Sequence, residues 1–96
     1  MNRTTAFLPE VTFSTFILSL ASSALVQLGE VTNPETNRLE QDLRMARHSI
    51  DILTMLRQKT ERSLDNQEQQ MLDSILYELQ MKYVIKYKDC SKDTAV

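Results

Sequence analysis

The sequence predicts an all-α fold, a small single domain of three helices. Residue types that favour helix, such as Leu, Gln, Glu and Lys, are frequent, whereas the 96 residues include one glycine and two prolines. Hydrophobic residues recur at helical spacing in three segments, which we expect to form helices over about 12–28, 42–61 and 66–88. A domain of this size buries only about 60–65% of the surface that its unfolded chain exposes, so its core is thin.

The first predicted helix comes from a stretch without charge, between Val11 and Gly29. Thr12 is its expected N-cap, because a threonine hydroxyl can accept a hydrogen bond from a free amide of the first turn. Gly29 is expected to end the helix, since glycine has no Cβ to oppose the left-handed conformation that a helix end often needs.

Apolar side chains cover two opposite sides of this helix, at about 100° of rotation per residue. One side holds Phe13, Phe16, Ile17, Leu20, Ala24 and Leu28, and the other holds Val11, Leu18 and Leu25, with Val26 nearby. A row of small residues, Thr15, Ser19 and Ser23, lies between them and would let another backbone approach closely. A helix that is apolar on two faces must bury both of them.

The uncharged stretch leaves three interpretations open. A membrane-spanning helix needs about twenty predominantly apolar residues, but serines and threonines dilute this stretch and no cluster of Lys or Arg flanks it. A secretory leader is supported by Arg3 and a small-residue site at 21–23, but Glu10 interrupts it and Cys90 has no disulfide partner. We therefore favour a soluble helix that is buried in protein on more than one side.

The second predicted helix follows a turn-rich connection over residues 30–41, centred on Asn33 and Pro34. These two residues could instead start the helix early, as cap and first residue, but we prefer a start at Asp42. The inward stripe of the second helix consists of Leu43, Ala46, Ile50, Leu53 and Leu56, with Met45, Ile52 and Met55 beside it. Its outer face is charged.

The third predicted helix follows a link short enough to make it an antiparallel neighbour of the second. Asp65 and Glu68 approximate a capping box at its start. We expect it to run to about Lys88 and to bury Leu72, Ile75, Leu76, Leu79 and Tyr83. The single domain then spans residues 11–88, with the first helix packed across the hairpin. Residues 1–10 form a polar arm and residues 89–96 a flexible tail.

Three motifs are distinctive: FSTFILSL at residues 13–20, LGE at 28–30 and IDILTML at 50–56. With these motifs, the chain over residues 8–87 resembles an uncharacterised bacterial family, the domain of unknown function 1844. The resemblance implies a small all-helical bacterial protein, with no established activity from which catalytic residues could be carried over. The chain departs from the family at Asn37, where the family often has a glycine soon after Pro-Glu-Thr.

No pattern in the sequence indicates catalysis, a cofactor or a metal ion. His48 is the only histidine, and no second His or Cys lies at ligand spacing from it. Cys90 is expected to be an incidental thiol. An active site is conceivable only if an oligomer joins Asp51, His48 and Tyr77 in one pocket. We therefore expect a protein that is not an enzyme.

Self-association is predicted because three helices cannot cover both apolar faces of the first helix. We expect a homodimer with a two-fold interface, built mainly from Val11, Leu18, Ser22, Leu25 and Val26. The net charge of −2 offers no concentrated basic face for nucleic acid, and the cysteine usage fits a reducing cytoplasm. The expected function is a non-catalytic interaction or scaffold role as a homo-oligomer, with an unidentified protein as a further partner. The alternative is a membrane-associated protein anchored through the first helix.

Overall fold

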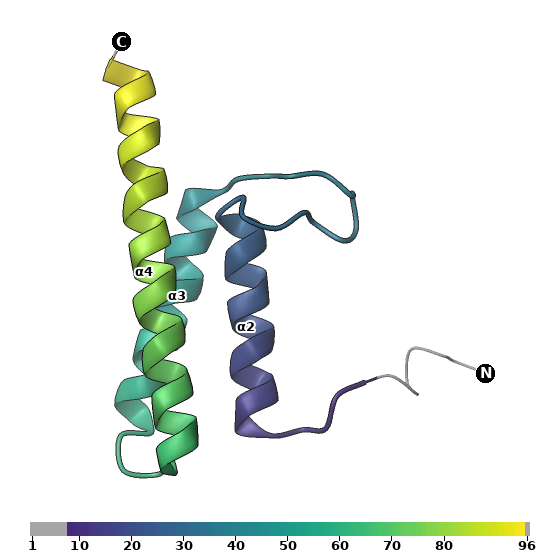
Figure 1. Cartoon of the computed structure of the whole chain (residues 1–96), viewed down its shortest axis with the longest axis vertical. Coiled ribbons are helices and arrows are strands. Elements are labelled where there is room, and N and C mark those ends of the chain that lie inside the picture. The colour runs from purple at the N-terminus through teal and green to yellow at the C-terminus, as the bar shows by residue number, and fades with distance from the viewer. Residues whose placement is uncertain (1–7, 96) are drawn as a thin grey trace, which may run out of the picture.

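The computed structural model describes residues 8–95, with side chains for residues 8–89. This part of the chain forms three α-helices: α2, Phe13–Gln27; α3, Leu43–Lys59; and α4, Asn66–Ala95. α3 and α4 run antiparallel as a hairpin, and α2 packs against both of them (Figure 1). The described residues contain no β-strand beyond an isolated bridge between Asn33 and Arg38. The predicted all-α fold of three helices is confirmed.

Local hydrogen bonds fix both ends of α2. The Thr12 hydroxyl accepts from the amide of Thr15, and the Thr15 hydroxyl accepts from the amide of Thr12, each at 3.0 Å. This reciprocal pair satisfies two amides that a helix start leaves open. At the other end Gly29 has a φ of +78°, and the amides of Gly29 and Glu30 donate back to the last turn of α2 at 3.0 Å. The expected cap residues are confirmed.

The connection between α2 and α3 is a compact turn. The amide of Asn33 donates to the carbonyl of Arg38 at 2.8 Å, and the amide of Asn37 donates back to the carbonyl of Asn33 at 2.7 Å. Asn37 has a φ of +59°, a left-handed conformation that asparagine tolerates better than most residues. Asn37 thus takes up a left-handed geometry that a glycine would also adopt without strain.

α3 begins after Asp42, whose carboxylate accepts from the amide of Met45 at 3.1 Å. This agrees with the preferred start of the second helix and not with the early start at Asn33. The Asp42 amide also donates to the carbonyl of Gln27 at 2.8 Å, and the buried Ser49 hydroxyl donates to the side chain of Gln27 at 2.7 Å. These bonds hold the end of α2 against the start of α3.

The core lies where the three helices meet. Five large side chains in it are almost fully buried: Ile17, Leu28, Leu53, Leu72 and Leu76. Ala21 and Ala24 are also buried on α2, and such small residues let α2 approach the hairpin closely. Transfer of a side chain such as leucine from water to this core contributes about 1.5–3 kcal/mol.

Phe16 is a correction to the expected inward face of α2. It was assigned to the same face as Ile17, but it is 48% exposed while Ile17 is fully buried. Adjacent helix residues are about 100° apart, and the hairpin covers only the arc of α2 that contains Ile17, Ala21 and Ala24. Met45 and Met55, which were placed beside the inward stripe of the second predicted helix, are exposed as well.

The C-terminal end of α4 also differs from the expectation. The helix was expected to stop near Lys88 and to give way to a flexible tail, but it continues to Ala95. No glycine or proline follows Asn66 to stop it. Residues 1–7 of the predicted arm, and Val96 at the end of the tail, lie outside the described residues.

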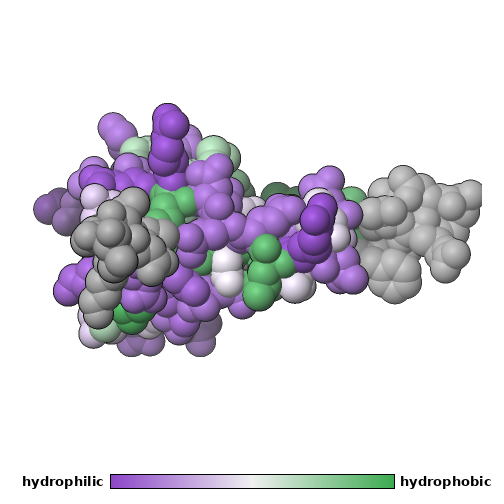
Figure 2. All heavy atoms as spheres, turned by 90° about the horizontal axis from the view of Figure 1, so that it is seen from above, coloured by the Kyte–Doolittle hydropathy of each residue, from purple (hydrophilic) through white to green (hydrophobic). Residues whose placement is uncertain are grey.

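α4 is much longer than the helices that support it. It has 30 residues, against 15 in α2 and 17 in α3, and its C-terminal part rises beyond both of them (Figure 1). Seen from above, along the length of α4, the surface is mostly hydrophilic with scattered hydrophobic side chains, and the part that extends to one side lies away from α4, on the side of α2 and the connection (Figure 2). The projecting end of α4 is important for the surfaces described below.

Replacing Gly29 by alanine should lower the free energy of unfolding by about 1–2 kcal/mol, because an L-residue pays that much in the left-handed region. A Cβ at this position would also lie 3.4 Å from the carbonyl oxygen of Glu40. Urea denaturation of Gly29→Ala and Gly29→Asn measures the effect. The free energy of unfolding should fall less in the asparagine variant than in the alanine variant. Equal decreases would contradict the explanation that the decrease comes from backbone strain.

Asn37 gives a second test of the same turn. Asn37→Gly should change the free energy of unfolding by less than about 0.5 kcal/mol, since glycine adopts a positive φ without strain. Asn37→Ala should lower the free energy of unfolding by about 1 kcal/mol. Urea denaturation of both variants checks this order, and an alanine variant as stable as the glycine variant would rule it out.

Candidate functional site

The predicted interface on α2 divides into an exposed part and a partly covered part. Val11 is 98% exposed and Leu18 is 49% exposed, and Ser22 is exposed beside them. Leu25 is partly buried and packs against the core. Val26 is partly buried and lines a hollow beneath the connection. The structure therefore leaves the N-terminal half of this surface open and uses Leu25 in the core.

Small hydroxyl residues separate the exposed apolar side chains of α2. Two of these hydroxyls are bonded within the chain: Ser19 donates to the carbonyl of Phe16 at 2.8 Å, and Thr15 donates to the carbonyl of Glu10 at 2.6 Å. A hydroxyl that is already hydrogen-bonded is much less costly to bury than an open one. The outer face of α2 is thus uncharged and suited to close contact.

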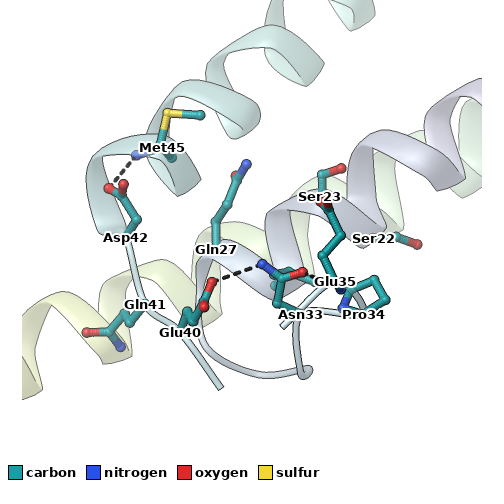
Figure 3. Close-up of a pocket in the computed structure, with 11 residues that line it drawn as sticks. Ser22, Ser23, Gln27, Asn33, Pro34, Glu35, Glu40, Gln41, Asp42 and Met45 are labelled. Carbon is teal, nitrogen blue, oxygen red and sulfur yellow. Dashed lines mark hydrogen bonds between the residues drawn. The ribbon is translucent and has the colours of Figure 1, made fainter. Parts of the chain in front are cut away.

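A hollow that borders α2 has a volume of about 580 Å³ and is open to one side. It lies between the end of α2, the connection and the start of α3, and Figure 3 shows its polar lining. The lining consists of Ser22, Ser23, Val26, Gln27, Asn33, Pro34, Glu35, Glu40, Gln41, Asp42 and Met45. This lining offers carboxylates, amides and hydroxyls, with no histidine, cysteine, lysine or arginine among them.

Glu40 organises the outer wall of this hollow. Its carboxylate accepts from the side-chain amide of Asn33 at 2.9 Å (Figure 3) and from the hydroxyl of Thr36 at 2.9 Å. The bond from Asn33 is the largest cause that lowers the pKa of Glu40 below its ordinary value of 4.5, and the bond from Thr36 and the charge of Arg38 act in the same direction. The Glu40 carboxylate therefore stabilises the turn through hydrogen bonds to Asn33 and Thr36.

The residues considered for catalysis are not brought together. His48 lines an open hollow with Asp42, Arg44 and Met45, while Asp51 lines another beside Tyr83 and Val84. Tyr77 lines a third, on the outer side of α4. The side chain of Cys90 lies outside the described residues. His48, Asp51 and Tyr77 thus do not share a pocket within one chain.

The described residues contain neither a metal-binding cluster nor a membrane-spanning helix. Over the described part of the chain, no three or more His, Cys, Asp or Glu side chains gather in a group that could hold a metal ion. None of the helices described has both the length and the apolar character required to cross a membrane.

Comparison with known families identifies the chain. The sequence profile of DUF1844, a domain of unknown function, matches residues 10–85. The chain belongs to the DUF1844 family. The match includes all of α2 and α3 and continues into α4 as far as Ile85. Comparisons with curated proteins and with solved structures found no match.

The DUF1844 domain has one exposed apolar surface that sequence reasoning missed. Tyr77, Met81, Val84 and Ile85 lie on the outer side of α4 and are 67%, 49%, 48% and 55% exposed; we call these four residues the α4 stripe. With Gln80 and Lys88 they line a hollow of about 430 Å³. The signal was available as spacings of four and three between Tyr77, Met81 and Val84, but the stronger inward stripe of the same helix masked it.

Acid should weaken the turn that Glu40 fastens in the DUF1844 domain. Because the pKa of Glu40 is lower in the folded state, its contribution to stability is present above about pH 4.5 and is lost as the pH falls below that value. In an NMR titration the Glu40 carboxyl carbon should have its midpoint below 4.5. Asn33→Ala should raise that midpoint, while Asn66→Ala, at the start of α4, should leave it unchanged. A wild-type midpoint at or above 4.5 would contradict this.

Proposed function

We propose that this DUF1844 domain is a non-catalytic helical interaction protein that acts as a homo-oligomer in the cytoplasm. The observation that carries the proposal is the exposure of Leu18 on a helix with no charged residue, together with the exposure of Val11 just before that helix. Single exposed hydrophobic residues are common on protein surfaces. An uncharged helix that keeps Leu18 in water, next to an exposed Val11, is less so, and an exposed apolar surface of this kind is typical of an interaction site.

A second copy of the same chain is the proposed partner of this face. A two-fold axis along α2 would bring Leu18 and Ser22 of one protomer against the same residues of the other. The face carries no charge, so two copies meet without repulsion, and its small hydroxyl residues allow the helices to approach closely. Val11 extends the interface before the helix, and Leu25 and Val26 form its margin because they are already half covered.

The acid and base groups of the described chain support a role without catalysis. His48, Asp51 and Tyr77 lie at separate hollows, and none is hydrogen-bonded to a nucleophile that it could activate. The proposal therefore assigns the α2 surface to assembly and assigns no chemistry to the polar hollow.

The proposal is tested with Leu18→Asp, measured by size-exclusion chromatography with light scattering at micromolar concentration. In a two-fold dimer both protomers bring the new charge into the interface, so two aspartates are buried there. We expect the dissociation constant of the dimer to rise about 100-fold or more. Met55→Asp is the matched control, because Met55 is a similarly exposed residue on α3, 44% against 49% for Leu18. It should leave the dimer intact.

Two outcomes would reject the α2 interface. One is a folded wild-type monomer at micromolar concentration, and the other is a Leu18→Asp dimer as tight as the wild type. Circular dichroism of both variants shows that the comparison is made between folded proteins. Both substituted side chains are about half exposed, so we expect their helix content to match the wild type.

A further inference from the structure

The α4 stripe is arranged like the contact line of a two-stranded coiled coil. Tyr77, Met81, Val84 and Lys88 follow one another at intervals of four, three and four residues, the alternation of contact positions in a heptad repeat. Ile85 widens the line beside Met81. The opposite side of the same helix carries Leu72, Leu76 and Leu79, which are buried in the core. α4 therefore has two apolar sides, and its own chain covers one.

On this part of α4, two lysines lie against its own chain while apolar residues lie on its outer side. The side that faces its own chain carries Lys82 and Lys86, whose ammonium groups lie 3.3 Å and 3.7 Å from carboxylate oxygens of Glu30. The side that faces outward carries Met81, Val84 and Ile85. A monomeric surface helix turns its apolar side inward and its charged side outward. Because α4 carries apolar residues on its outer side as well as its inner side, we expect the outer side to be covered by another molecule.

We infer that the α4 stripe pairs with the α4 stripe of a second copy in antiparallel orientation, as a second self-association surface. The charges select this orientation. An antiparallel two-fold pairing about the middle of the stripe places Lys88 over the ring of the partner subunit's Tyr77 and Met81 against the partner subunit's Val84. A lysine over a tyrosine ring is an attractive cation–π arrangement. Parallel pairing would instead place the two Lys88 ammonium groups side by side, and it would align the two helix dipoles.

The size of the stripe sets the strength of this contact. Four large side chains that are half to two-thirds exposed present on the order of 400 Å², about half of the roughly 800 Å² that each partner buries in a standard stable interface. The α4 contact is therefore weaker than a stable dimer and forms at high protein concentration. Because it lies on a different helix from the proposed α2 interface, the two contacts together join dimers into larger assemblies.

The experiment measures molar mass against concentration by sedimentation velocity, from micromolar to about millimolar protein. The α4 pairing stands whether or not the proposed α2 interface exists, and three variants separate the two: Leu18→Asp, Val84→Glu, and the double variant. Val84→Glu should remove the concentration-dependent growth and leave the α2 dimer. Leu18→Asp should give a monomer that dimerises only at high concentration, and the double variant should remain a monomer throughout.

Cross-linking tests the orientation in a Cys90→Ser background. Tyr77→Cys mixed with Lys88→Cys should form a disulfide-linked pair under mild oxidation at high concentration, and neither variant should link to itself. Self-linking of each variant without linking of the mixture would overturn the antiparallel pairing. Identical mass profiles for Val84→Glu and wild type would overturn the α4 contact itself, and would leave the stripe to a partner of another kind. Loss of growth in Leu18→Asp alone would overturn the α4 contact and retain the α2 interface.

Discussion

The fold depends on the contact that α2 makes with the hairpin of α3 and α4. Ile17 and Leu28 fill the space between the helices, and Ala21 and Ala24 let the backbones approach. Only one arc of α2 can enter such a contact, because two neighbouring helices enclose one side of a third. This geometric limit leaves Leu18 in water although α2 contains no charge. The same limit applies to α4, which is apolar on two sides and has a neighbour on one.

The compact turn between α2 and α3 fixes how α2 meets the hairpin. Gly29 and Asn37 both adopt a left-handed backbone conformation. The amide of Asp42 joins the two ends of the turn by donating to the carbonyl of Gln27 at 2.8 Å. Glu40 binds the outside of the turn through Asn33 and Thr36. The polar hollow in Figure 3 is thus explained by the bonds that build the turn, and the two apolar surfaces remain as features that no other described residue covers.

The sequence predicts well whatever depends on local chemistry. Thr12, Gly29 and Asp42 mark helix ends because their side chains or backbones bond within a few residues, and all three are found at those ends. Features that depend on how helices are placed are harder to predict. Phe16 fits the helical period of the buried face, but the arc that the hairpin covers stops before it. Leu25 was predicted to lie in the dimer interface, but it packs against the edge of the core. Helical periodicity alone cannot distinguish these two positions.

The ion pairs at Glu30 have a mechanical consequence. One carboxylate just after α2 contacts two lysines of α4 and so adds an ionic link, beside the packing of Tyr83 on the core, between the projecting helix and the body of the molecule. These side chains are partly exposed, with about a third of each in solvent, and salt screens such pairs strongly. An increase in ionic strength is therefore expected to loosen this ionic link and to make the projecting end of α4 more mobile, while the packing of Tyr83 on the core is unaffected.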